Sequence, residues 1–186
     1  MDTIQQKHSL EVQLREAYGR VTYTYTAHLK LMNRLEKKNK CLKSVQITLS
    51  AITTGGFLGT LIFDERILTF IAGLVSAISL GLNLYFKDFK LAEEAKQHQI
   101  ASDKLWLIRE KYITLLTDLE TLSLDEISLE RNQLRDETHV IYMESPKTDS
   151  NSYSEAQNAL KNEEEQFFEE EELDKMLPKH LRKSNK

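Results

Sequence analysis

The chain has 186 residues, a formal net charge of −4 and 29% charged residues, a composition typical of an ordinary soluble protein. Its single cysteine, Cys41, excludes a disulfide within the chain. The average hides a strong segregation of charge, because residues 44–86 carry only three charged side chains, Asp64, Glu65 and Arg66.

Residues 1–43 are predicted to form a helix that precedes the apolar region. The segment contains no proline and no apolar stretch long enough for a cleavable signal peptide. Its larger side chains recur at alternating spacings of three and four, which is the seam pattern of a coiled coil. The seam consists of Leu14, Tyr18, Val21, Tyr25, His28, Met32, Leu35, Asn39 and Leu42.

Residues 44–63 and 67–86 are two uncharged blocks of twenty residues each. A bilayer core about 30 Å thick needs roughly twenty helical residues to cross it. We therefore expect two transmembrane helices joined by an extracytoplasmic turn at residues 64–66, where the charges reach water. The alternative is a buried helical hairpin in a soluble domain, but such a helix usually keeps a charged face and neither block has one.

The charged residues that flank the two blocks predict the orientation. Six basic residues lie between Lys30 and Lys43, and Lys87, Lys90 and Lys96 follow the second block, whereas the turn carries only Arg66. By the positive-inside rule both termini are cytoplasmic. The sequence thus predicts a multi-pass membrane protein with almost no external part.

Residues 87–120 are predicted to continue from the second crossing as an antiparallel partner of the first stalk helix. The segment lacks proline and again has residues spaced by three and four. His28 and His98 lie on the two seams, and we expect them to be packed or hydrogen-bonded because no further metal ligands are spaced to join them. The second seam consists of Ala95, His98, Ala101, Leu105, Ile108, Tyr112, Leu115 and Leu119.

Residues 121–186 form an acidic C-terminal extension with 9 basic and 16 acidic residues, a net charge of −7, whereas residues 1–43 have a net charge of +5. Two capping boxes, Ser123 with Glu126 and Ser154 with Gln157, predict two short helices. The extension either folds against the basic stalk or is a solvated end that avoids anionic lipid, and we favour the solvated end.

The two apolar blocks carry rows of small and of polar residues. Small residues four apart allow close helix packing, within the hairpin or between subunits. They are Ala51, Gly55 and Gly59 in the first block, and Gly73, Ala77 and Gly81 in the second. The polar rows either line a pore between several hairpins or hydrogen-bond between helices and to their own backbone. They are Gln46, Ser50, Thr53 and Thr60, and Thr69, Ser76, Ser79 and Asn83.

The chain carries no motif of a familiar enzyme class. It has no glycine-rich phosphate loop, no paired-cysteine motif, no His-Glu metal motif and no nucleophile elbow. The basic residues near the membrane lack interleaved aromatic residues, so lipid contact explains them better than nucleic-acid binding. We expect no enzymatic activity, no cofactor and no direct nucleic-acid partner.

Three stretches resemble the SLATT proteins, two-transmembrane effectors associated with bacterial nucleotide-signalling and reverse-transcriptase defence systems. They are "YGRVTYTYTAHLKLMNRLEKKNK", the predicted hairpin, and "LAEEAKQHQIASDKLWLIREKYITLLTDL". Trp106, Arg109, Glu110 and Tyr112, with Leu115, Leu116 and Asp118, match the post-hairpin helix of the family best, and the tail resembles the C-terminal extension of one subgroup.

The resemblance implies an all-α fold and a role rather than a reaction. Members of the family are regarded as pore-forming effectors that breach the inner membrane when a partner system senses infection. We therefore expect a homo-oligomer in the lipid bilayer that depolarises the cell on receiving a signal. A structural adaptor, whose hairpin only anchors a cytoplasmic coiled coil, is the competing class, and a holin-like phage protein is a third.

Overall fold

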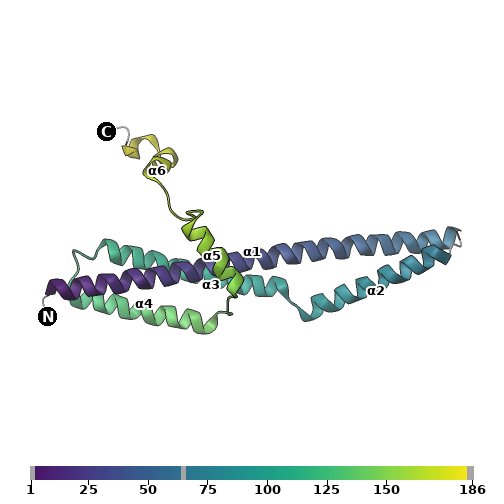
Figure 1. Cartoon of the computed structure of the whole chain (residues 1–186), viewed down its shortest axis with the longest axis horizontal. Helices are drawn as coiled ribbons and strands as arrows, with labels where there is room; N and C mark the ends of the chain where they lie inside the picture. The colour runs from purple at the N-terminus through teal and green to yellow at the C-terminus, as the bar shows by residue number, and fades with distance from the viewer. Residues whose placement is uncertain (1–2, 64–65, 184–186) are drawn as a thin grey trace.

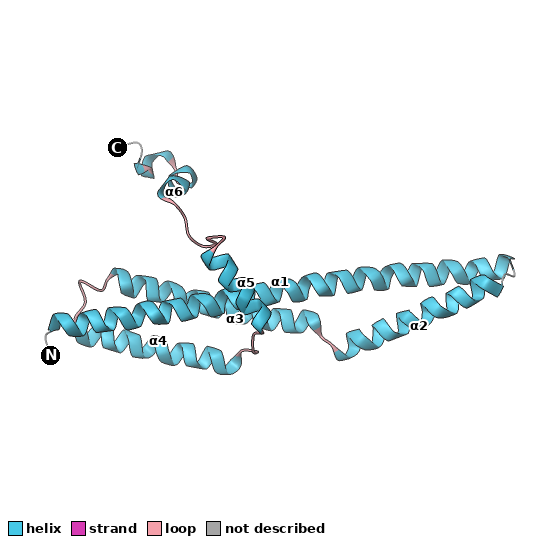
Figure 2. Ribbon diagram, in the orientation of Figure 1, coloured by secondary structure: helices cyan, strands magenta, loops and turns pink. Residues whose placement is uncertain are grey.

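The computed structural model describes residues 3–63 and 66–183, with the side chains of all of these except residues 57–63, 66, 68 and 87. The described residues form six α-helices and one 3-10 turn and contain no strand, so the all-α class is confirmed. Figures 1 and 2 show an elongated molecule in which one long helix runs through both a helical bundle and a thinner two-helix arm.

The long helix is α1, Thr3–Phe63, which extends over 61 residues. At a rise of 1.5 Å per residue it is about 90 Å long. No proline interrupts it, and its only glycine before Gly55 is Gly19. The predicted stalk helix and the first predicted crossing are therefore one uninterrupted helix.

The helix α3, Leu91–Thr117, packs along the N-terminal half of α1. All residues of the predicted α3 seam are buried, and all those of the α1 seam are buried or partly buried. Burial at every seam position agrees with the predicted pairing of the two segments. The largest side chains at the centre include Leu14, Val21 and Leu105.

The helix α4, Leu124–Glu144, completes a bundle with α1 and α3. Its first turn contains the predicted capping box, in which the Ser123 hydroxyl accepts from the Glu126 backbone N–H at 3.3 Å and the Glu126 carboxylate accepts from the Ser123 N–H at 2.9 Å. Ile127, Leu134 and Ile141 follow at intervals of seven residues and belong to the same core cluster as Leu14, Val21 and Leu105. These buried aliphatic side chains hold α4 on the bundle.

The arm consists of α2, Arg66–Asp88, which runs back beside the C-terminal half of α1 (Figure 1). The helix ends before the stalk begins, because Phe89 and Lys90 are not helical. The prediction that the second crossing continues unbroken into its stalk helix is therefore wrong. At the break the Tyr85 and Phe89 rings stack with centroids 4.6 Å apart, and Lys38 of α1 lies 5.6 Å from the Tyr85 centroid.

The C-terminal extension divides into two parts. The helix α5, Ser150–Lys161, packs across α1, whereas α6, Glu170–Met176, and the turn Lys179–Leu181 have no buried residue and lie apart from the bundle in Figure 1. The preferred expectation of a solvated tail is thus right for α6 and wrong for α5. The second capping box is also wrong, because the cap is Asp149, which accepts the Ser152 backbone N–H at 2.7 Å.

Candidate functional site

The two helices of the arm meet along a seam in which polar and small residues alternate with aliphatic ones. The partly buried positions recur at spacings of three and four on both helices, as in a coiled coil. They are Gln46, Leu49, Thr53 and Gly56 on α1, and Ala72, Val75, Ser79, Leu82 and Phe86 on α2, where Tyr85 beside Phe86 is partly buried too. The side chains that line this seam therefore include three of the predicted polar residues.

Gln46 of α1 and Asn83 of α2 form a polar contact between the two arm helices. The Gln46 side-chain amide donates to the Asn83 carbonyl oxygen, close to the bundle end of the arm. The contact satisfies one donor and one acceptor, which would be costly to leave unpaired in apolar surroundings. The prediction that these two residues lie together near the cytoplasmic boundary agrees with this contact, and whether they line water stays a prediction.

The remaining polar residues of the rows divide into seam and surface positions. The Thr53 hydroxyl donates to the Leu49 carbonyl of its own helix at 2.8 Å, as the packing alternative expects. The Ser79 hydroxyl is buried and has no hydrogen-bond partner among the described residues. Ser50, Thr69 and Ser76 are exposed. The side chain of Thr60 lies outside those that the structure describes.

The rows of small residues do not close the hairpin within one chain. Ala51, Gly55, Gly73, Ala77 and Gly81 are all exposed, and a methyl group added at any of the three glycines would meet nothing within 4 Å. Close approach occurs instead at Gly56, where an added Cβ would lie 3.8 Å from the Ala72 Cβ. Packing between subunits through the exposed rows stays a prediction. Gly59 lies among the residues whose surroundings the structure does not describe.

At the centre of the bundle, His28 of α1 and His98 of α3 form a buried pair. Their Nδ1 atoms are 2.8 Å apart, and the two residues are 2% and 0% exposed. One ring must donate and the other accept, so the pair is satisfied only while at least one ring keeps an unprotonated Nδ1. Burial, followed by the neighbouring His98, lowers the pKa of His28 to about 4.

His98 is held neutral by the same surroundings. Burial lowers its pKa, while Glu94 and Asp149 act in the opposite direction. Its Nε2 atom is buried without a hydrogen-bond partner in the described part of the chain. Residues 3–63 and 66–183 contain no group of three side chains able to hold a metal ion. The pair is therefore best described as a packed hydrogen bond that links α1 to α3.

The residues of the post-hairpin motif have different environments on α3. Tyr112 is 3% exposed in the core, and burial raises its pKa. Arg109 donates to the Glu110 carboxylate at 2.6 Å and lies 5.8 Å from the centroid of Tyr18 on α1. Trp106 is 48% exposed on the outer side of the helix. Two members of the motif thus tie α3 to the bundle, and Trp106 is open to a partner.

An ionic contact that the sequence did not reveal holds α5 on α1. Arg34 donates to Glu155 at 3.0 Å and also to Asp149, and Lys30 pairs with Glu165 at 2.7 Å. These five residues are called the α5 cluster below. The Ser152 N–H, then Arg34, lowers the pKa of Asp149 to about 2. The opposite net charges of the two segments indicated attraction, but not the register of the contact.

One described segment, Thr69–Thr117, contains an 18-residue window with a mean hydropathy of 1.6, apolar enough to cross a membrane, and none of that window is buried. The first predicted crossing, residues 44–63, includes side chains outside the description and stays a prediction. The chain gives no match to a curated protein or to a solved structure.

A family model covers nearly the whole chain. The model describes the SMODS and SLOG-associating 2TM effector domain family 4, and it matches residues 10–172. The match includes the bundle, the arm and α5, and it ends within α6. The resemblance seen in the three sequence stretches is thereby confirmed, and with it an association with membranes and with conflict systems. The chain belongs to this SLATT family of two-transmembrane effector domains.

Proposed function

We propose that the chain is the membrane effector of an anti-phage or other conflict system. It inserts into the bacterial inner membrane with both termini in the cytoplasm, assembles with copies of itself and opens a pore when a partner signals. The partner is a nucleotide-signalling or reverse-transcriptase system. The pore depolarises the membrane and arrests or kills the cell. The chain itself performs no catalysis.

The observation that carries this proposal is the outer surface of the arm. Asn83 and Ser76, seven residues apart on α2, are exposed polar residues on a helix whose other exposed side chains are mostly aliphatic. Polar side chains that face hydrocarbon are costly and in membrane proteins usually face other helices or water. A single helix pair encloses no water, so an assembly of several arms accounts for this surface best.

The exposed small residues support the same assembly. Gly55 and Gly73, with their neighbours Ala51, Ala77 and Gly81, leave open space where a second helix backbone can approach closely. Because α1 is one helix of about 90 Å, a displacement of the bundle is transmitted directly to the arm. The bundle therefore supplies a route by which a cytoplasmic signal reaches the membrane.

The test replaces a surface polar residue by leucine. We expect Asn83→Leu to abolish depolarisation, because an apolar constriction dries a narrow path, while membrane insertion persists. Induced cells carrying a membrane-potential dye give the readout. Thr48→Leu is the matched control, since Thr48 is exposed on α1 and lies on the side opposite Gln46. Val75 is unsuitable as a control because it is partly buried on the α1–α2 seam.

A non-conducting anchor is the second candidate, and the contacts inside the arm favour it. The Gln46–Asn83 amide contact and the Thr53 hydrogen bond satisfy polar groups within one chain. If Asn83→Leu forms normal cross-linked oligomers and depolarises cells as fast as the wild type, the polar row is not pore lining. If induction of the wild type with an intact partner system never changes the membrane potential, the anchor replaces the pore.

A further inference from the structure

Two neighbouring cavities lie in the bundle where α1 faces α4 and the segment that leads to α5. The larger has a volume of about 640 Å³, and the smaller about 430 Å³. Both are lined by Arg20 of α1 and Tyr142 of α4, so they lie side by side and share these two residues. Each volume falls within the range of small-molecule sites.

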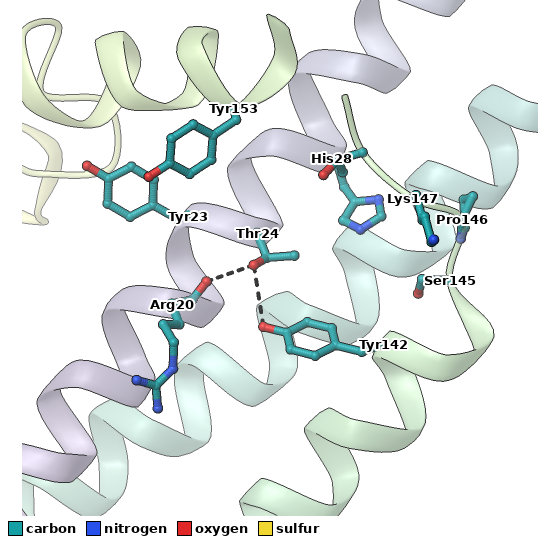
Figure 3. Close-up of a pocket in the computed structure, with 10 residues that line it drawn as sticks. Arg20, Tyr23, Thr24, His28, Tyr142, Ser145, Pro146, Lys147 and Tyr153 are labelled. Carbon is teal, nitrogen blue, oxygen red and sulfur yellow. Dashed lines mark hydrogen bonds between the residues drawn. The ribbon is translucent and has the colours of Figure 1, made fainter. Parts of the chain in front are cut away.

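The larger cavity is an aromatic compartment. Tyr23 and Tyr153 stack with centroids 5.8 Å apart at 27°, and Tyr142 lies opposite them, where its hydroxyl donates to Thr24 at 3.4 Å (Figure 3). Tyr142 and Tyr153 remain 42% and 53% exposed. His28 and Lys147 are at one end of the compartment and Arg20 is at the other. The exposed aromatic faces can stack with a flat ring, and the cations Lys147 and Arg20 at the two ends favour negative charge elsewhere on the same molecule.

The smaller cavity is a cationic compartment, whose lining includes three arginines, Arg20, Arg131 and Arg135. Arg131 donates to Gln13 and Asn132, each at 3.0 Å, so neutral amides orient its guanidinium without cancelling its charge. Among the described residues, Arg20 and Arg135 form ion pairs with exposed carboxylates on their own helices, Glu16 and Asp136. Arginine groups arranged in this way bind phosphate oxygens well, because the planar guanidinium offers paired donors.

The charge of the groove is opposite to that of the segments around it. Residues 121–186 have a net charge of −7, yet no described carboxylate lines either cavity. Lys147, which lies in this acidic part of the chain, has no ion pair in the described residues and faces the aromatic compartment. Arg131, held by amides, and Lys147 keep positive charge next to the stacked tyrosines, and this arrangement is complementary to a small molecule that carries both a flat ring and negative charge.

We propose that this groove binds a nucleotide, with its base against Tyr153 and Tyr142 and its phosphates against Arg131 and Arg20. The shared position of Arg20 and Tyr142 matches the join between base and phosphate within one ligand. Such a ligand contacts α1, α4 and α5 together. The last step, and only this one, rests on the proposed function. Binding changes the force that the bundle exerts on α1, and in this way it controls the arm.

The test measures binding by equilibrium dialysis of the purified full-length chain in detergent. ATP and GTP are the probes, and adenosine and inorganic tripolyphosphate represent the two halves. We expect at least one triphosphate to bind about tenfold or more tightly than either half, because both compartments contribute. Tyr153→Ala and, separately, Tyr142→Ala weaken that binding about tenfold and leave tripolyphosphate unchanged.

Arg131→Gln weakens the binding of nucleotide and tripolyphosphate alike. The matched controls are Phe89→Ala, an exposed aromatic outside the groove, and Arg15→Gln, an exposed cation on the same helix as Arg20. Failure of both triphosphates to bind below about 1 mM overturns the inference. The inference is also overturned if tripolyphosphate binds as tightly as the nucleotide, or if the groove variants and the control variants bind nucleotide with equal affinity. No measurement in this test reports conductance. A chain that binds nucleotide but never depolarises cells therefore refutes only the proposed pore.

Discussion

The His28–His98 pair makes the bundle sensitive to mild acid. In the folded chain the pKa of His28 is about 4, whereas an exposed histidine has 6.5. The unfolded chain therefore takes up this proton first as the pH falls, and folding stability is lost between about pH 6.5 and pH 4. With these two values, linkage gives a loss of about 2 kcal/mol between pH 7 and pH 5. Little discount for solvent applies, because both rings are buried.

The measurement is the melting temperature of the purified chain in detergent at pH 7 and pH 5. A loss of about 2 kcal/mol corresponds to roughly 4–8 °C for a chain of this size. The double variant His28→Gln/His98→Gln keeps an amide pair at the contact but cannot titrate, so we expect its acid shift to be smaller by at least that amount, since burial lowers the pKa of His98 as well. His139→Gln, an exposed histidine on α4, is the control and should keep the full shift.

Charged groups from three segments act on the histidine pair. Glu94 of α3 and Asp149 at the start of α5 favour the protonated form of His98, and Arg34 of α1 neutralises Asp149. A first proton leaves the Nδ1–Nδ1 hydrogen bond intact but is opposed by burial, whereas a second proton would also place two donors 2.8 Å apart. If the double glutamine variant loses as much stability on acidification as the wild type, the pair is not the acid-sensitive element.

Three further predictions concern the α5 cluster, the arm and the topology. Arg34→Gln should lower the free energy of unfolding by about 1 kcal/mol, since all partners are partly exposed. Thermal melting measures this loss, and the control variant Lys40→Gln should not show it. Gly73→Leu with Gly81→Leu should reduce cross-linked oligomers without affecting insertion, and unchanged oligomers would exclude this interface. Reporters fused at residues 1 and 186 should both be cytoplasmic, and periplasmic activity at either end would refute the hairpin topology.

The part of the fold that the sequence predicted best is the α1–α3 pairing. Its two seams are long, regular and free of proline, and burial at each position follows from the period alone. The break at Phe89 and Lys90 was not predictable in the same way. Neither residue is a helix breaker, and the interruption coincides with a tertiary contact, the stacking of Tyr85 on Phe89 beneath Lys38. Local propensity does not encode such a contact.

The start of α5 shows how a local rule can select the wrong residue. Ser154 and Gln157 have the spacing of a capping box, but Asp149 caps the helix one turn earlier, where Arg34 also fixes its carboxylate. The tertiary ion pair and the cap stabilise the same rotamer, so the two contacts choose the earlier start together. Charge totals indicated that the extension and the stalk attract, but only the structure shows which carboxylates are used.

The groove escaped sequence analysis because its residues come from three separate segments. Arg20 and Tyr23 lie on the side of α1 that flanks the seam, Arg131 and Tyr142 lie on α4, and Tyr153 comes from α5. On each helix these residues resemble a solvated surface, and no short motif joins them. Their convergence depends on the position of α5, which the α5 cluster sets. Loss of that cluster should therefore remove Tyr153 from the groove and leave the cationic compartment intact, so Arg34→Gln should weaken nucleotide binding while tripolyphosphate binding is unchanged.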